Sequence, residues 1–549
     1  MKQSIIGLFF VLFLVNTTFA NEQISETEKL TLTGKVWGFL KYYHPNVAEG
    51  KFNWDDELFR ILPKVKASTT KEDLSQVYLE WIQGLGQVKK CNKCIKTNEA
   101  ETFDKNFNLN WITNSQILTP EVIKELLFIE QNRHQGQQYY VTANKTTGYA
   151  TISNEIVYKD LDWTNEDFRL LTLFRYWNII EYFFPYKYQT DVNWDAVLTK
   201  LSVQFLHAQS ELDFHLAMLE LVVSIDDSHA DFFTNTLATY FGIYMLPVNL
   251  DIIEDQAVIT GYFNTEFAEQ DDLKIGDVIL KIDNITIEDI FSDRIKYIPG
   301  SNIPKKKDKA YHKVFKGTTN KVTIEYMRDN QIKTKQVSRY QYQELNFKRE
   351  VSNERFKILD DSIGYINMCE LTIEEVPSAM EALKHTKSII FDIRNTPNET
   401  LYAISNYINS EERDFYKVIY PDLNYPGKFI WRDGITCGSN GELKYLGKIV
   451  LLVNENAQSH AEFTIMCLQT GDNVTTIGSQ TSGADGEVSY IAMAGGEMTM
   501  FTGVGMFYPD KTETQRKGIK IDIVVQPTIK GIMEGKDELL ERAITFLNE

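Results

Sequence analysis

Ser459 is the residue whose place in the sequence best fits a catalytic nucleophile. It follows a buried apolar strand, residues 448–453, after a short loop, and opens a predicted helix over 460–470. Backbone N–H groups at a helix N-terminus can stabilise a developing oxyanion. This is the strand–turn–helix arrangement of a nucleophile elbow, although GxSxG itself is absent. The alternative role for a serine here is that of a helix cap.

A serine hydroxyl needs a base within hydrogen-bond reach before it can attack a carbonyl. Of the eight histidines, His229 is the best candidate, because it follows two Asp residues and Ser228 at the end of an apolar helix. Neighbours of that kind could hold one imidazole tautomer, whereas a histidine considered alone is more often structural. His229 and Ser459 are far apart in the chain (459 − 229 = 230), so their contact is a structural prediction.

A repeat places His229 within the chain. WGFLKYYHP (37–45) and NWD (53–55) recur as WNIIEYFFP (177–185) and NWD (193–195), at a constant shift (177 − 37 = 140). Each copy predicts an aromatic helix stopped at Pro, a loop, a helix opened by Asn-Trp-Asp, and a further apolar helix.

The two copies differ at one place. The second ends in DDSHADF, whereas Val88 and Lys89 stand opposite Ser228 and His229 in the first. If these residues served only to pack the helices, the same residue types would suit both copies. The difference between the copies therefore favours a function for the Ser-His pair.

The pattern changes twice after the repeat. Short β segments and hairpin turns follow from about residue 240, and from about 356 apolar strands alternate with helix-length segments, which predicts an α/β layer domain with a largely parallel sheet. The charge run at 305–307 is interpreted as a solvated face. The fold class is therefore multidomain α+β. The expected units are a signal peptide (1–20), the first repeat and a linker (21–150), the second repeat with Ser-His (151–239), a small β domain (240–345) and the α/β domain (346–549).

Composition and length indicate a globular chain of several domains and argue against nucleic-acid binding. Acidic residues exceed Lys and Arg by 19 (76 − 57 = 19), and no long basic block is present, so nucleic acid is not an expected partner. Contents of 43% apolar and 12% aromatic residues are those of a globular chain with large cores. A length of 549 residues indicates several domains.

The first 20 residues are typical of an export signal. Lys2 precedes an apolar run over 5–15, and residues 18–20 fit a signal-peptidase site. An uncleaved anchor is the alternative. No later stretch approaches 18 consecutive apolar residues, so we expect no membrane span after signal removal and a soluble, periplasmic or secreted chain.

Cys91 and Cys94 form a CxxC, and the other three cysteines are scattered. No thioredoxin-like pattern surrounds the pair, and no second pair stands at zinc-binding spacing. We therefore predict a structural role for the CxxC, as a local disulfide or as two thiols, with no metal and no other cofactor.

The order of the motifs resembles that of the tail-specific (C-terminal processing) and tricorn-type serine peptidases. DDSHADF, LKIGDVILKID, FDIRN, VNENAQSHAEF, TIGSQTSGADG and GIKIDIVVQP follow one another across residues 165–545. The resemblance implies that 240–345 is a PDZ domain, which binds peptide C-termini by strand addition. It also implies that 346–549 is a crotonase-like α/β serine peptidase domain.

The resemblance assigns the two central residues. Ser459 stands at the nucleophile position, with Glu462 three residues later. Processing-type members pair this serine with a lysine in TxGK, but here Ala484 occupies that place. Tricorn-type members use a histidine preceded by serine, which Ser228 and His229 match. The resemblance therefore implies that His229 is the general base for Ser459.

A relay behind the histidine is also implied. Ser228 belongs to it, and in the tricorn type it ends at an acidic residue shortly before the late Gly-Ile. Gln515 stands three residues before Gly518 here, and Glu513 two residues earlier. A neutral glutamine would stabilise an imidazolium less than a carboxylate would.

The oxyanion hole of the family maps onto two backbone amides. One is that of His460, directly after the nucleophile, and the other is that of Asn398, in a loop where the family usually has glycines. Asparagine tolerates unusual backbone angles better than most residues.

These observations predict an exported serine endopeptidase that acts on peptides or protein C-terminal tails. Two alternatives stay open: an inactive protein on the same fold that binds peptides or apolar ligands, as in retinoid-binding relatives, and an envelope scaffold built on the helical repeat. The sequence leaves the oligomeric state open.

Overall fold

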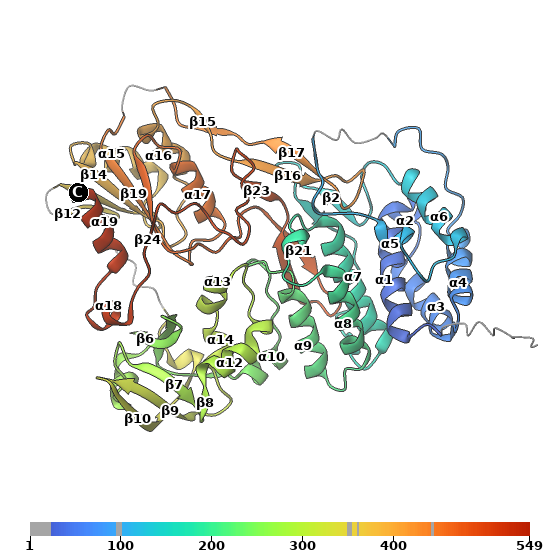
Figure 1. Cartoon of the computed structure of the whole chain (residues 1–549), viewed down its shortest axis with the longest axis horizontal. Helices are drawn as coiled ribbons and strands as arrows, with labels where there is room; N and C mark the ends of the chain where they lie inside the picture. Colours follow the sequence, from blue (N-terminus) through green and yellow to red (C-terminus); the bar gives the residue numbers. More distant parts are fainter. Residues whose placement is uncertain (1–22, 95–100, 348–353, 360–361, 441–443) are drawn as a thin grey trace, which may run out of the picture.

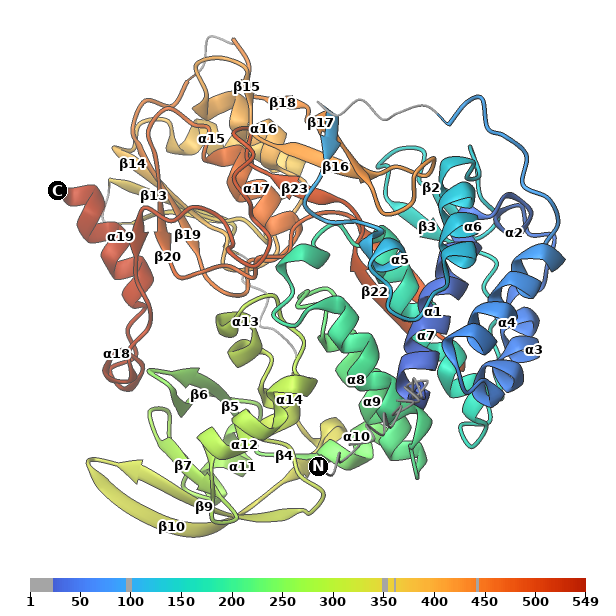
Figure 2. The same cartoon turned by 45° about the vertical axis from the view of Figure 1, so that its right-hand side comes forward.

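The computed structural model describes residues 23–94, 101–347, 354–359, 362–440 and 444–549. The predicted signal peptide, residues 1–20, lies outside these ranges. Within them the architecture is mixed α and β, as expected, with three regions arranged side by side (Figures 1 and 2). None of the helices in the described ranges has the length and apolar character that crossing a membrane requires.

The helical region is a structural duplication. α1 (Glu26–Tyr43), α3 (Trp54–Ala67) and α4 (Lys71–Gly84) recur as α7 (Glu166–Phe183), α8 (Trp194–Leu206) and α9 (Glu211–Val223), at the shift found in the sequence (166 − 26 = 140). The side chains of Asn53 and Asn193 cap α3 and α8, as the NWD motifs predict. Shorter elements connect or cover these helices: α2 (Pro45–Ala48), β1 (Thr102–Phe103), α5 (Asn110–Thr113), α6 (Pro120–Gln131), β2 (Val141–Ala143), β3 (Ala150–Ile152), η2 (Lys187–Gln189) and α10 (Asn235–Phe241).

Each copy is held by the same pair of tryptophans. The indole N–H of Trp37 donates to the carbonyl of Trp54 at 3.1 Å, and the indole of Trp54 donates back to the carbonyl of Trp37 at 3.1 Å. Trp177 and Trp194 repeat the exchange at 2.9 and 3.1 Å. These bonds satisfy buried polar groups that would otherwise be costly, which explains why the repeat keeps both tryptophans.

The two copies pack closely where α1 meets α7. A Cβ on Gly34 would lie 2.7 Å from the ring of Phe174, and the side-chain amide of Asn178 donates to the carbonyl of Gly34 at 2.9 Å. Gly34 therefore permits a close contact between α1 and α7 that a larger side chain at this position would block.

The middle region is built on an antiparallel sheet with strand order β10-β9-β7-β6-β5. The turn at Asp283 and Asn284 has positive φ at both residues, as in a tight hairpin. Hairpin turns are what the sequence predicts for this region. The elements of this region are β4 (Tyr244–Met245), β5 (Val248–Ile253), β6 (Gln256–Tyr262), α11 (Thr265–Gln270), β7 (Val278–Ile282), β8 (Ile285–Thr286), α12 (Ile287–Arg294), η3 (Ile295–Tyr297), α13 (Ile303–Asp308), α14 (Tyr311–Val314), β9 (Lys321–Arg328), β10 (Gln331–Ser338), β11 (Tyr340–Gln341) and η4 (Tyr342–Glu344).

The C-terminal region contains the largely parallel sheet that the sequence predicts, in the order β12-β13-β14-β19-β20-β24. Only β12 pairs antiparallel within it. The elements are β12 (Phe356–Leu359), β13 (Ile363–Asn367), η5 (Ile373–Glu375), α15 (Val376–Leu383), β14 (Ser388–Asp392), α16 (Leu401–Ile408), β15 (Arg413–Asp414), β18 (Thr436–Cys437), β19 (Lys448–Val453), α17 (His460–Leu468), β20 (Val474–Gly478), β24 (Ile523–Val524), α18 (Ile529–Met533) and α19 (Glu538–Asn548).

An arm of the C-terminal region reaches across to the helical repeats. It consists of β16 (Lys417–Pro421), β17 (Phe429–Asp433), β21 (Val488–Ala492), β22 (Met498–Thr502) and β23 (Gly505–Phe507). β17 pairs with β1 of the N-terminal segment, and Phe501 and Phe507 join the hydrophobic core of the helices. Figure 1 draws β21, and Figure 2 draws β22, beside α7. Strand β22 of the arm also contacts the loop that follows α9, where the amide of Thr502 donates to Asp227 at 2.6 Å.

Two local expectations can be compared with the structure. Cys91 and Cys94 form a local disulfide, which is one of the two forms predicted for the CxxC. The interpretation of 305–307 as a solvated face is wrong for two of its lysines. Lys305 and Lys306 are buried, because their ammonium groups pair with Asp308 at 2.7 Å and with Asp226 at 2.9 Å.

Candidate active site

Ser459 sits in a strained turn between β19 and α17. Its backbone has φ 54° and ψ −120°, a left-handed conformation that non-glycine residues rarely adopt. It occupies the N-cap position, yet its side chain makes no capping hydrogen bond, and the residue is half-buried. The Ser459 side chain therefore does not cap α17, and a strained turn between a strand and a helix is the backbone geometry that a nucleophile elbow requires.

Glu462 fixes the loop that faces this turn. Its buried carboxylate accepts hydrogen bonds from the Thr481 hydroxyl at 2.5 Å and from the amides of Gly483 and Ala484 at 2.8 and 2.9 Å. Burial raises the pKa of Glu462, although these three donors oppose the rise. The carbonyl of Ala484 in turn accepts the amide N–H of Ser459 at 2.9 Å.

His229 lies within the loop between α9 and α10, and its ring is held through Nδ1. This nitrogen is 2.9 Å from the hydroxyl of Thr502, on β22, and 3.4 Å from a carboxylate oxygen of Asp227. The other ring nitrogen, Nε2, is buried and has no hydrogen-bond partner within the described ranges. If Nδ1 carries the proton, Nε2 presents its lone pair, as a general base requires.

Asp227 places a carboxylate beside the imidazole ring of His229. Its carboxylate accepts the backbone amides of Thr502 at 2.6 Å and of His229 at 3.1 Å. Burial alone would raise the pKa of Asp227, but the hydrogen bonds and charge interaction with His229 and the Thr502 amide outweigh burial and lower it. The carboxylate is therefore ionised at neutral pH.

Ser228 does not contact the His229 ring. Its hydroxyl donates to Ser301 Oγ at 3.0 Å and accepts the Ser301 amide at 2.8 Å, and the ammonium of Lys309 donates to the Ser228 carbonyl at 2.7 Å. Ser228 thus anchors the loop to the segment before α13. The side chains beside the His229 ring are those of Asp227 and Thr502.

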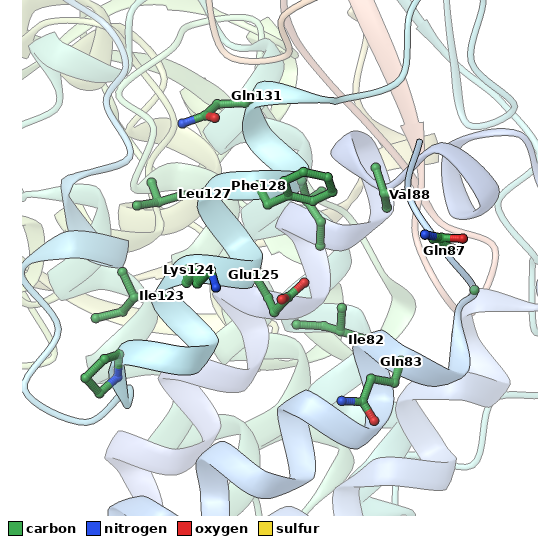
Figure 3. A pocket seen from close by; sticks show the side chains of 13 residues that line it. Ile82, Gln83, Gln87, Val88, Ile123, Lys124, Glu125, Leu127, Phe128 and Gln131 are labelled. Atoms are coloured by element: carbon green, nitrogen blue, oxygen red, sulfur yellow. The ribbon is translucent and has the colours of Figure 1, made fainter. Parts of the chain in front are cut away.

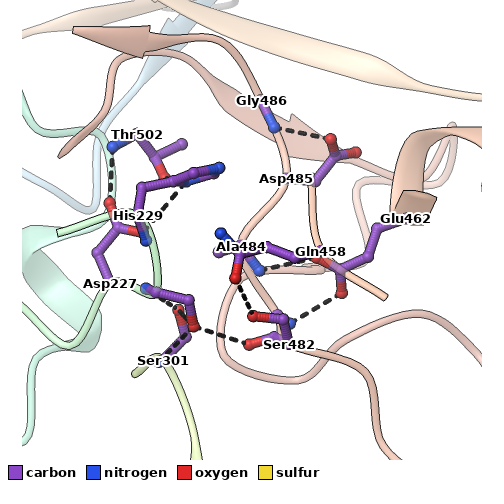
Figure 4. A network of polar contacts seen from close by, with 12 residues as sticks. Asp227, His229, Ser301, Gln458, Glu462, Ser482, Ala484, Asp485, Gly486 and Thr502 are labelled. Carbon is purple, nitrogen blue, oxygen red and sulfur yellow. Dashed lines mark hydrogen bonds and ion pairs between the residues drawn. The ribbon is translucent and has the colours of Figure 1, made fainter. Parts of the chain in front are cut away.

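The loop of His229 and the turn of Ser459 belong to one polar network (Figure 4). The Ser228 hydroxyl also lies 3.4 Å from the carbonyl of Ser482, and the Ser482 hydroxyl donates to the side chain of Gln458 at 3.1 Å. Gln458 immediately precedes Ser459. The network joins the two regions, but Nε2 of His229 is not hydrogen-bonded to Ser459, an open geometry that is common in unliganded catalytic sites.

Asp485 is an ionisable residue of this network that the sequence did not single out. Burial, followed by the nearby charge of Glu462, raises its pKa well above the ordinary value. One of its oxygens accepts the Gly486 amide at 2.7 Å, and the other is buried and has no hydrogen-bond partner among the residues that the structure describes. Burial at this place in the network therefore disfavours the charged form of the Asp485 carboxyl.

The two predicted oxyanion donors differ in availability. The amide of His460, at the N-terminus of α17, makes no hydrogen bond to another described residue. The amide of Asn398 donates to the carbonyl of Met368 at 3.2 Å, so it does not point into a site. The ring of His460 lies 3.4 Å from the Asn398 carbonyl, which links the two segments.

Gln515 and Glu513 lie in different surroundings. Gln515 is buried, and both atoms of its amide lack a partner among the described residues. Glu513 accepts from the hydroxyl of Tyr188 at 3.0 Å and pairs with Lys517 at 2.9 Å. No hydrogen bond joins either residue to His229 in the described structure.

The matching loop of the first repeat lacks this chemistry. Residues 86–88 stand where the second copy has 226–228, and they line an apolar cavity of about 1020 Å³ between α4 and α6 (Figure 3). Ile82, Leu127 and Phe128 contribute to its walls. The two copies therefore differ not only in residue types at this loop but also in its surroundings, which are an apolar cavity in the first copy and a polar network in the second. Across the described ranges, no group of three or more His, Cys, Asp or Glu side chains could hold a metal ion.

Comparisons with known proteins agree with this architecture. Residues 362–525 match the model of peptidase family S41, which confirms the resemblance for the C-terminal domain. No curated protein sequence matches the chain.

Solved structures are similar at low sequence identity. Mature CPAF complexed with lactacystin has 12% identity and a TM-score of 0.55, covering 70% of this chain and 99% of its own. The photosystem II D1 C-terminal processing protease has 15% identity and a TM-score of 0.37, with coverages of 67% and 98%. Tricorn protease has 13% identity and a TM-score of 0.33, with coverages of 70% and 36%. The likeness to CPAF supports a shared fold.

Proposed function

We propose that this chain, whose residues 362–525 form a domain of peptidase family S41, is a serine endopeptidase with Ser459 as nucleophile and His229 as general base. One observation carries the proposal. Ser459 is held in a strained turn without capping its helix, within the same polar network as a histidine whose Nδ1 is held and whose Nε2 is unpartnered. Nε2 of His229, which would take the proton, therefore has no hydrogen-bond partner among the described residues.

In the proposed reaction, Nε2 of His229 takes the proton of the Ser459 hydroxyl as its oxygen attacks the scissile carbonyl. The imidazolium that forms is stabilised by the ionised carboxylate of Asp227 and oriented by the hydroxyl of Thr502. The proton then passes to the leaving amine, and water hydrolyses the acyl-enzyme with His229 again as base.

The amide of His460 is the proposed first oxyanion donor, because it lies free at the N-terminus of α17. A second donor requires that the loop around Asn398 exchange its bond to Met368 for the substrate oxyanion. We place Ser228 in the anchoring of the His229 loop, and we assign Gln515 and Glu513 no step.

The substrate is proposed to be a peptide or a protein tail. The antiparallel β region over 240–345 would act as a PDZ domain, whose free strand edge captures a chain terminus. Ser301 and Lys306, from this region, contact the loop of His229, which would place a captured substrate close to the catalytic residues. We also propose that the chain is exported and loses residues 1–20, and that 21–150, 151–239 and 346–549 are its other units.

Hydrolysis of a quenched fluorescent peptide library by the mature chain tests this proposal. We expect cleavage by the native protein and a loss of at least about 10³-fold in Ser459→Ala and in His229→Ala. Ser489→Ala is the matched control, because this serine lies on β21 and its hydroxyl donates to the carbonyl of Ala150. Equal activity in native protein and Ser459→Ala would refute the proposed nucleophile.

A second candidate function is peptide binding without hydrolysis. The observation that favours it is the hydrogen bond between the Asn398 amide and Met368, which leaves the oxyanion hole with one donor. Under this alternative, peptides would bind to the native chain and remain intact over long incubation. Retention of binding in Ser459→Ala together with absence of any cleavage product would select it.

A further inference from the structure

A polar cavity lies between the segment over 105–114 and the second helical copy, and neither Ser459 nor His229 lines it. It has a volume of about 630 Å³, and its lining includes the side chains of Trp111, Asn110, Asn114, Glu181 and Asp195. The side-chain amides of Asn110 and Asn114 and the indole N–H of Trp111 make no hydrogen bond to another described residue. Several donors and acceptors therefore face one space.

The equivalent place in the first copy is closed by the chain itself. Lys41, the counterpart of Glu181 (181 − 140 = 41), binds the buried carboxylate of Glu155 at 2.6 Å. The ring of Tyr139 covers Gly50, the counterpart of Thr190 in the cavity wall, where a Cβ would lie 2.4 Å from that ring. The duplication thus contains one filled site and one open site.

The first copy is filled further at its aspartate. Asp55, the counterpart of Asp195, accepts the hydroxyl of Tyr158 at 3.0 Å and the guanidinium of Arg175 at 2.6 Å. In the first copy the place of a ligand is therefore taken by the ring of Tyr139, the hydroxyl of Tyr158 and the carboxylate of Glu155. A ligand in the second copy would contact the corresponding helices, but with Glu181 in the place of Lys41.

Charges at the open site are already compensated. Glu181 pairs with Lys187 at 2.7 Å, and both side chains are only 11% exposed. Asp195 pairs with Lys35 at 2.8 Å. An anionic or cationic ligand would have to break one of these pairs or bring an unpaired charge into the cavity, which is costly. A neutral ligand avoids that cost.

We propose that this cavity binds a neutral, hydroxyl-rich ligand, namely a saccharide unit. Side-chain amides can donate and accept at once, and carboxylate oxygens accept, so both suit vicinal hydroxyls. The ring of Trp111 offers an apolar face for the C–H surface of a sugar. A saccharide site beside a peptidase domain would hold the chain on a glycan-bearing surface or substrate.

Titration of the full mature chain with cellotriose, chitotriose and maltotriose, followed by calorimetry and saturation-transfer NMR, tests the proposal. We expect at least one trisaccharide to bind with a Kd of about 1 mM or tighter. Trp111→Ala and Asn114→Ala should each weaken binding by about 10-fold or more. Asn114 is exposed, so its replacement leaves the fold intact.

The matched control is Trp163→Ala, because Trp163 is also half-buried in the helical region but does not line the cavity. It should bind the same trisaccharide with unchanged affinity. Absence of binding by all three sugars at about 10 mM, or equal binding by native chain and both cavity variants, would overturn the proposal. Peptidase activity should be unchanged in Asn114→Ala, which separates this test from that of the catalytic residues.

Discussion

Replacement of Asp227 by asparagine tests the part played by the charge behind His229. The carboxylate lies 3.4 Å from Nδ1 and is ionised, whereas asparagine keeps the shape and one acceptor oxygen without the charge. The imidazolium exists only after proton transfer. The lost interaction therefore affects the transition state and leaves substrate binding largely unchanged.

The expected size follows from the distance. Two unit charges 3.4 Å apart attract each other by about 5 kcal/mol at an effective dielectric constant of about 20. The amide dipole of asparagine and the hydroxyl of Thr502 retain part of this stabilisation. We therefore expect a loss of about 2.7–4 kcal/mol, or about 10²- to 10³-fold in kcat, with little change in KM.

Steady-state cleavage of a fluorogenic peptide from pH 5 to 9 measures both quantities. The acidic limb of kcat/KM should move to lower pH in Asp227→Asn, because a charge that favours the protonated imidazole has been removed. Asp231→Asn, an exposed aspartate two residues beyond His229, should behave as the native protein. A kcat within threefold of native for Asp227→Asn, with an unmoved profile, would refute the reasoning.

Three further predictions rest on the same geometry. Thr502→Val removes one neutral hydrogen bond to Nδ1, about 1 kcal/mol, and should lower kcat about 5-fold in the same peptide assay; a larger effect than that of Asp227→Asn would contradict the ranking. Gly483→Ala should destabilise by about 2–4 kcal/mol in urea unfolding, because φ is +66° and the new Cβ would meet the Arg516 backbone at 2.8 Å; an unchanged midpoint would count against it. The pKa of Asp227 is lower in the folded chain, so its contribution to stability is present above the unfolded value of about 3.9 and is lost as pH falls below it; thermal unfolding from pH 6 to 3 should show a shallower loss in Asp227→Asn.

Much of the framework could be predicted from local patterns. The shift of 140 residues between the tryptophan motifs reports a true duplication (177 − 37 = 140), because each copy needs the same reciprocal bonds between its tryptophans. The position of Ser459 follows from a buried strand, a short loop and an apolar helix, all of which are encoded within about 25 residues. The two copies of the repeat differ at His229, where the first copy has Lys89, and this difference favours a function for the histidine.

The partners of the proposed catalytic residues could not be predicted in this way. Thr502 meets His229 across 273 residues of chain, and Ser301 meets Ser228 across 73, and no periodicity marks either contact. The sequence noted Asp227 as a neighbour of His229, but not that its carboxylate also accepts the Thr502 amide. The amide of Asn398 turns towards Met368, a choice made by loop packing rather than by residue type.

Labelling with a fluorophosphonate, followed by mass spectrometry of the digested chain, tests the central claim most directly. An activated serine reacts with this probe, whereas ordinary serine hydroxyls do not. We predict one adduct, on Ser459, in the native protein, and a loss of labelling in His229→Ala and Ser459→Ala. An unlabelled native chain, or an adduct on any other serine, would contradict the account.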